Sequence, residues 1–194
     1  TGSAIVSVAN DTGNGTGEID LSLTNSILWG NAGQDGSTNQ ISTENETTVR
    51  LQNALVQEAE GDGITTEGGS TVLFLDTDGE AVDFAQSTNL DANPLFVDAD
   101  NPTGQDRLFP TDDDGLRLTF GSPAFNAGTQ TPFETGGIAE DITTDLLRED
   151  RIQDGAVSLG AYERAALGTR LVLQVTPGAE TVTLTLSNTG DASV

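Results

Sequence analysis

Almost none of the sequence shows the 3.6-residue periodicity of an amphipathic helix, and this feature restricts the chain to an all-β fold. Strand-like runs recur instead, separated by Gly, Asn, Asp and Pro at intervals of roughly 15–25 residues. This spacing suits either a β-sandwich or a solenoid whose turns stack as parallel strands. The expected strands are Ala4–Ala9, Ile19–Leu28, Thr47–Val56, Ser70–Leu75, Leu90–Val97 and Thr169–Leu186.

The residue inventory excludes several functional classes. The chain of 194 residues has 31 acidic and 7 basic residues, a net charge of −24, and contains no Lys, His, Cys or Met. A His or Cys nucleophile, a Schiff-base lysine, a typical zinc site and a disulfide scaffold are therefore excluded. Nucleic acid and anionic membranes should repel the chain, and no apolar run is long enough for membrane insertion.

The acidic excess also predicts a habitat. Self-repulsion at this net charge is relieved in concentrated salt, which screens charges beyond ~3 Å at 1 M. We therefore expect a protein of a halophilic microorganism that is exposed to concentrated salt. An ordinary acidic or calcium-loaded extracellular surface is the alternative.

Four motifs follow one another along the chain: NSILWGN at 25–31, NPLFVD at 93–98, GSPAFNAG at 121–128 and GAYE at 160–163. Their order resembles the C-terminal rungs of right-handed parallel β-helix surface proteins of the choice-of-anchor Q family, over about Leu21–Glu163. The resemblance implies a right-handed parallel β-helix over residues 1–163, with Asn and Gly at the corners of its coils. It also implies a location at the cell surface or outside the cell. The residues expected to point inward are Ile27, Leu51, Leu55, Leu95, Val97, Leu116, Leu118, Val157 and Leu159.

Residues 164–194 have a different pattern, which predicts a C-terminal β-hairpin or the start of an immunoglobulin-like β-sandwich. Strict alternation places apolar residues on one face, and a lone hairpin is marginal in water, so this face needs a partner. It would cap its own solenoid, begin a truncated sandwich, or be donated as a strand to a neighbouring subunit. The candidate assembly residues are Leu171, Leu173, Val175, Val182, Leu184 and Leu186.

Acidic loops are the candidate metal sites, because Ca²⁺ takes oxygen ligands from flexible Asp, Asn and Gly segments. None of these loops has the full EF-hand pattern, and a solvated acidic loop is the alternative interpretation. The candidate calcium ligands are Asp76, Asp78, Glu80, Asp98, Asp100, Asp106, Asp112 and Asp114. We name no other cofactor.

A non-catalytic structural or adhesive role is the favoured function. Its expected partners are further copies of the chain, stacked head to tail into filaments through their terminal strands, or other surface modules and glycans. The alternatives are a polysaccharide lyase or hydrolase and a glycan-binding β-helix. A lyase would need Arg as its base, although Arg stays charged at neutral pH; we expect Arg148 and Arg151 to pair instead with Asp145, Glu149 or Asp150.

Overall fold

A computed structural model describes residues 5–8, 18–32, 38–163, 169–174 and 183–188. Among these described residues the regular elements are strands, apart from two short 3-10 turns, so the prediction of an all-β protein is confirmed. The chain divides into two units, Thr1–Glu163 and Arg164–Val194. In the described parts of the chain, no helix has the length and apolar character needed to cross a membrane.

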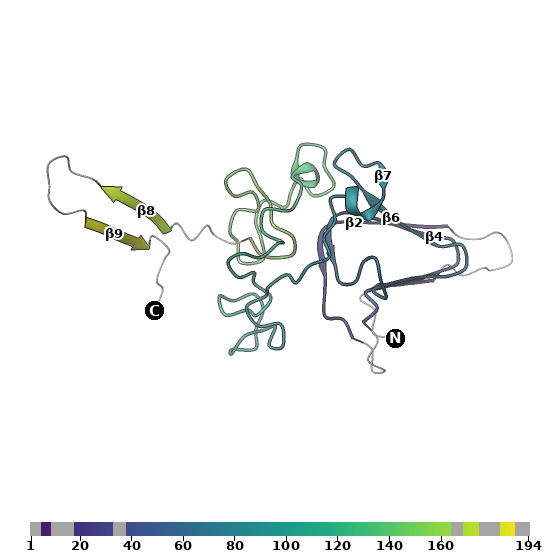
Figure 1. The fold of residues 1–194 in the computed structure, drawn as a ribbon, viewed down its shortest axis with the longest axis horizontal. Coiled ribbons are helices and arrows are strands. Elements are labelled where there is room, and N and C mark those ends of the chain that lie inside the picture. The colour runs from purple at the N-terminus through teal and green to yellow at the C-terminus, as the bar shows by residue number, and fades with distance from the viewer. Residues whose placement is uncertain (1–4, 9–17, 33–37, 164–168, 175–182, 189–194) are drawn as a thin grey trace. The chain divides into compact units, whose positions relative to one another are not determined.

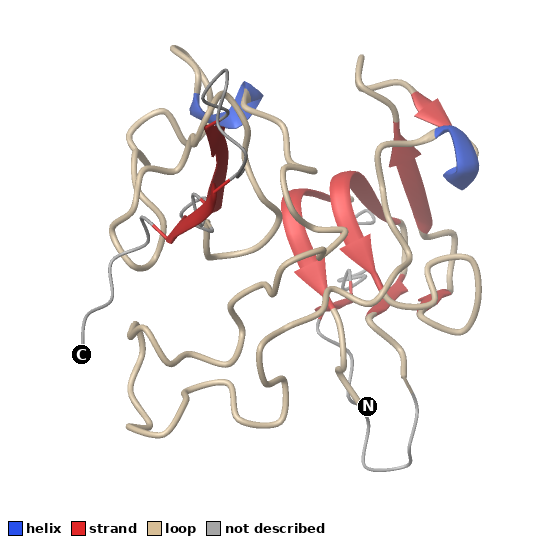
Figure 2. Ribbon diagram, turned by 60° about the vertical axis from the view of Figure 1, so that its left-hand side comes forward, coloured by secondary structure: helices blue, strands red, loops and turns tan. Residues whose placement is uncertain are grey.

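Two sheets of parallel strands form the N-terminal half of the first unit (Figures 1 and 2). One sheet has the order β1-β3-β5, and the other has the order β2-β4-β6-β7. Ile41 pairs with Ile64 and Val49 with Val72, so this step is 23 residues long in both sheets (64 − 41 and 72 − 49). The preceding step is longer, 36 residues from Ile5 to Ile41 and 28 residues from Leu21 to Val49 (41 − 5 and 49 − 21). Their strands are β1 (Ile5–Val8), β2 (Ile19–Leu28), β3 (Ile41–Glu44), β4 (Thr47–Val56), β5 (Ile64–Thr66), β6 (Thr71–Leu75) and β7 (Ala81–Val82).

The strand β7 breaks the parallel order of its sheet. This short strand lies antiparallel on β6, with Phe74 opposite Val82. The 3-10 turn Phe84–Gln86 follows. The ring of Phe84 packs edge-on against the ring of Phe74, and the ring centroids are 5.1 Å apart. β7 therefore interrupts the parallel pairing at β6, and beyond it Leu90 again pairs parallel with Leu55 of β4.

Bends at equivalent positions keep successive turns of the chain in register. Asn25 and Asn53 have φ values of 53° and 48° in the middle of β2 and β4. Asparagine tolerates this left-handed conformation better than β-branched residues do. Between β3 and β4, the bend at Glu46 stacks on the bend at Gly68, whose carbonyl accepts a 3.0 Å hydrogen bond from the Glu46 N–H. The expectation of Asn and Gly at bends is thus confirmed at these positions.

The bend at Asn53 also sends neighbouring apolar side chains to two different cores. Leu51 is fully buried in a cluster with Ile41, Val49 and Val56. Leu55 is equally buried but belongs to a second cluster, with Leu118, Ala124 and Leu159. Because the left-handed residue shifts the alternation by one, Leu51 and Leu55 do not share the single interior that the sequence pattern predicts.

Residues 91–163 pack on the paired strands without adding long strands of their own. This described segment contains isolated bridges, turns and the 3-10 turn Thr131–Phe133. The expected strand at Leu90–Val97 is reduced to bridges at Leu90 and Phe96. Leu95 and Val97 are 40% and 56% exposed, so the prediction that they point inward is wrong.

The reason for this error is local. Leu95 follows Pro94 and has a φ of 52°, so the chain turns where an extended strand was expected. Of the remaining inward candidates, Val157 is buried as predicted, whereas Ile27 and Leu116 are only partly buried.

The second unit contains β8 (Thr169–Gln174) and β9 (Thr183–Asn188), which pair antiparallel as predicted. Leu171 lies opposite Leu186, and Leu173 lies opposite Leu184. The candidate assembly residues Val175 and Val182 lie outside the described residues.

Candidate functional site

The first acidic loop uses a carboxylate to close its own turn. One oxygen of Asp76 accepts hydrogen bonds from the backbone N–H groups of Asp78 and Glu80, both 2.9 Å long. The turn lies between β6 and β7, and all three side chains are solvent-accessible. This carboxylate is therefore already engaged by the chain.

The second acidic region, residues 98–114, also directs carboxylates at the backbone. Asp106 accepts from the N–H of Leu108 at 2.8 Å, and Asp113 accepts from that of Gln105 at 2.6 Å. Hydrogen bonds from the Thr111 hydroxyl and the Gln105 N–H lower the pKa of Asp113. Asp113 stands between the candidate calcium ligands Asp112 and Asp114 in the sequence.

Asp114 differs from its neighbours because it is fully buried. Its carboxylate accepts a 2.6 Å hydrogen bond from the Tyr162 hydroxyl and a 2.9 Å bond from the Thr111 N–H. Burial, followed by the hydrogen bond to Asp114, raises the pKa of Tyr162. Asp114 thus anchors the end of the first unit.

No group of three or more acidic side chains in the described residues is gathered in a way that could hold a metal ion. Asp98, Asp100 and Asp112 belong to the same loop region as Asp106 and Asp114. Calcium binding by these residues stays a prediction.

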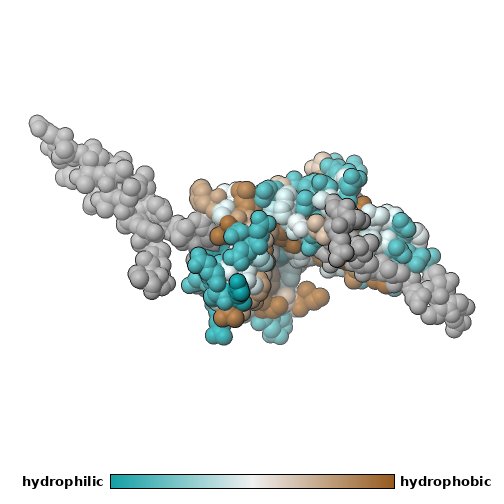
Figure 3. All heavy atoms as spheres, turned by 90° about the horizontal axis from the view of Figure 1, so that it is seen from below, coloured by the Kyte–Doolittle hydropathy of each residue, from teal (hydrophilic) through white to brown (hydrophobic). Residues whose placement is uncertain are grey.

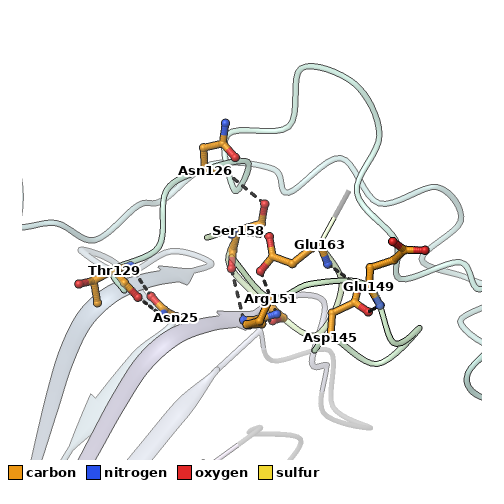
Figure 4. A network of polar contacts seen from close by, with 9 residues as sticks. Asn25, Asn126, Thr129, Asp145, Glu149, Arg151, Ser158 and Glu163 are labelled. Carbon is orange, nitrogen blue, oxygen red and sulfur yellow. Dashed lines mark hydrogen bonds and ion pairs between the residues drawn. The ribbon is translucent and has the colours of Figure 1, made fainter. Parts of the chain in front are cut away.

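A buried charge network, drawn in Figure 4, ties the end of the first unit together. Arg151 and Glu163 are 7% and 5% exposed and lie 3.0 Å apart, nitrogen to oxygen. The Arg151 guanidinium also donates to the Gly160 carbonyl at 2.8 Å. Glu163 accepts from the Ser158 N–H at 2.8 Å, and its own N–H donates to Asp145 at 2.8 Å.

The partner of Arg151 was therefore predicted wrongly, because its ion pair is with Glu163 and not with Asp145, Glu149 or Asp150. Asp145 instead accepts from the backbone N–H groups of Glu149 and Glu163. Burial raises the pKa of Glu163 despite the neighbouring arginine, and Asp145 adds to the rise. The GAYE motif at 160–163 was the sequence signal for this region.

Asn25 connects the network to β2. Its side-chain amide donates to the Thr129 carbonyl and its side-chain oxygen accepts from the Thr129 N–H, both at 2.8 Å (Figure 4). The Asn25 carbonyl also accepts from the Gly160 N–H at 2.9 Å. Asn53, the equivalent residue of β4, donates to the Ala127 carbonyl at 2.8 Å. The two left-handed asparagines thus attach residues 127–160 to the paired strands.

A mainly apolar groove of about 530 Å³ opens beside this attachment. Ser22, Thr24 and Asn25 of β2 form one side. The other side comes from residues 132–146, including Phe133 and Ile138. Arg151 also lines the groove, with its guanidinium 5.4 Å from the centre of the Phe133 ring.

The charged groups at this groove already have partners within the chain. Arg151 donates a hydrogen bond to the Gly160 carbonyl and forms an ion pair with Glu163. Asp145 accepts hydrogen bonds from two backbone N–H groups. The groove therefore presents mainly apolar surface, together with the hydroxyl groups of Ser22 and Thr24, and is better suited to binding than to acid–base catalysis. No family model, curated protein or solved structure matches the chain.

Proposed function

We propose that residues 5–90 are coils of a right-handed parallel β-helix. The parallel pairing of successive strands in both sheets supports this proposal, as do the stacked bends at Asn25 and Asn53. Right-handed crossovers account for about 98% of connections between parallel strands of one sheet. A cluster of buried aliphatic residues between the sheets is what such coils require.

The proposed role of this β-helix is structural or adhesive, at the cell surface or outside the cell, without catalysis. The observation that carries the proposal is that Arg151, Glu163 and Asp145 interact with one another within the chain. Arg151 and Asp145 line the groove; Arg151 forms an ion pair with the buried Glu163, and Asp145 accepts hydrogen bonds from two backbone N–H groups. A general base needs a free position within hydrogen-bond reach of substrate.

The acidic surface supports the expected halophilic origin. Self-repulsion at a net charge of −24 is tolerable where concentrated salt screens it. The same charge disfavours polyuronate substrates, which are themselves anionic.

An assay on polysaccharides tests the non-catalytic role. Purified protein is incubated in concentrated salt with neutral and acidic polysaccharides, and new reducing ends and unsaturated products are measured. We expect neither above a heat-denatured control. An activity that forms these products and copurifies with the folded protein would contradict the structural role and identify the protein as a lyase or hydrolase.

A further inference from the structure

The turn between β3 and β4 contains a motif that the structural role leaves unexplained. Its residues Asn45, Glu46 and Thr47 form an Asn-x-Thr sequon, the pattern that carries N-linked glycans on surface loops of secreted proteins. The sequence has two more Asn-x-Thr sequons, at Asn10 and Asn14, which lie outside the described residues. Asn45 is therefore the sequon asparagine whose surroundings the structure describes.

Asn45 is exposed on a sharp turn at one end of the paired strands. Both Asn45 and Glu46 have a φ of 54°, and the neighbouring turn contains Gly68. A Cβ atom at Gly68 would come within 2.8 Å of the side-chain oxygen of Asn45, so glycine leaves room for the Asn45 side chain. Hydrophilic side chains are visible at this end of the strands in Figure 3. A sugar on Asn45 would extend into solvent and displace no core residue.

The Asn45 amide also differs in its contacts from those of other left-handed asparagines. Asn25 and Asn53 donate their amide N–H groups to the carbonyls of Thr129 and Ala127, both at 2.8 Å. No hydrogen bond joins the Asn45 amide to another residue of the described ranges. Its amide nitrogen is thus not used to attach one described segment to another.

Thr47 supplies the hydroxyl that completes the sequon. In the folded chain Thr47 is buried, and its hydroxyl donates a 3.0 Å hydrogen bond to the Glu44 carbonyl. A transferase that recognises this hydroxyl must therefore meet the motif before the turn closes. The folded turn then keeps Asn45 at the surface, where an attached glycan is accommodated.

We propose that Asn45 is an N-glycosylation site. Its amide nitrogen forms a bond to C1 of the first sugar of a lipid-phosphate-linked oligosaccharide, and the bond from C1 to the lipid phosphate breaks. The phosphate leaves with the bonding electron pair, and the amide loses one proton to a base of the transferase. The inference rests on the proposed location outside the cell, because this transfer takes place at a membrane while chains are exported.

Peptide mapping by mass spectrometry tests the inference on the full chain, purified from the cells that produce it naturally. We expect a glycan on Asn45. Asn45→Asp should lose the glycan while keeping a residue that tolerates the left-handed turn. Thr47→Ser should keep the glycan because it keeps the hydroxyl, and Thr47→Ala should lose it.

Asn126 is the matched control within the same molecule. It is exposed and has a φ of 52°, but Ala127 and Gly128 follow it, so it belongs to no sequon. Asn126 should carry no glycan, and Asn126→Asp should leave the glycan on Asn45 in place. Circular dichroism should show that the variants are folded.

Three results would overturn the inference: an unmodified Asn45 in chains recovered from outside the cell, equal modification of Asn126, or a glycan at position 45 in Asn45→Asp. The first result would leave the extracellular structural role standing, because the chain would still have been exported. Unmodified chains found within the cell alone would contradict both the glycosylation and the proposed location. The polysaccharide assay tests the non-catalytic role independently.

Discussion

Replacing Asn25 by alanine should detach the bend in β2 from the segment that packs on it. The change removes two hydrogen bonds to Thr129, each 2.8 Å long and each contributing about 1 kcal/mol. It also places alanine at a φ of 53°, which costs about 1–2 kcal/mol. The expected loss in the free energy of unfolding is therefore about 3–4 kcal/mol.

Asn45 provides the matched control. Its φ of 54° is nearly the same, but it is exposed on the bend between β3 and β4. Asn45→Ala should therefore cost only the backbone term, about 1–2 kcal/mol. The difference between the variants, about 2 kcal/mol, measures the attachment through the Asn25 side chain.

The assay is urea unfolding at constant salt, followed by far-ultraviolet circular dichroism. The transition midpoint should fall further for Asn25→Ala than for Asn45→Ala, with an unchanged dependence on urea. Equal losses in the two variants would refute the reasoning, because the side-chain bonds of Asn25 would then contribute nothing.

Three further predictions concern the core, the buried pair and the charge. In urea unfolding, Leu51→Ala should lower the free energy of unfolding by about 2–5 kcal/mol because Leu51 is fully buried. Leu95→Ala, at a 40% exposed site, should lower it by less than about 1 kcal/mol. Comparable losses in the two variants would place Leu95 in the core. Burial raises the pKa of Glu163, so its contribution to stability is greatest below its ordinary pKa and falls as the pH rises through the raised pKa. Unfolding between about pH 4 and pH 8 should therefore show the original chain losing stability relative to Glu163→Gln as the pH rises, and a relative gain would contradict this sign. Finally, the free energy of unfolding should increase from low to multimolar NaCl, and equal values would count against a halophilic protein.

The long strands could be predicted from the sequence because alternation and strand-forming residues coincide in them. The expected runs Ile19–Leu28 and Thr47–Val56 have the bounds of β2 and β4. The same pattern failed at Leu95 and Val97, where a turn after Pro94 leaves apolar side chains in solvent. Apolar residues next to a proline thus did not distinguish a strand from a turn.

The partners of charged residues could be predicted less well than the strands. Arg151 has four acidic residues within six positions of it in the sequence, yet its ion pair is with Glu163. That choice depends on how residues 145–163 fold back on themselves. Asp76 and Asp114, expected as calcium ligands, turn out to accept hydrogen bonds from the chain itself, because carboxylates serve both purposes in Gly- and Asp-rich loops.

Engineered cysteine pairs test the stacked coils most directly, since the chain has no cysteine of its own. Asp20 lies beside Thr48 and Thr48 beside Thr71 in the register of β2, β4 and β6. Neighbouring strands are about 4.8 Å apart, within the span of a disulfide, whereas Asp20 and Thr71 are two strands apart at about 9.6 Å. Stacked coils predict that Asp20→Cys/Thr48→Cys and Thr48→Cys/Thr71→Cys oxidise readily within one chain while Asp20→Cys/Thr71→Cys does not. Rapid oxidation of that third pair, or failure of the first two in folded protein, would contradict the parallel coils.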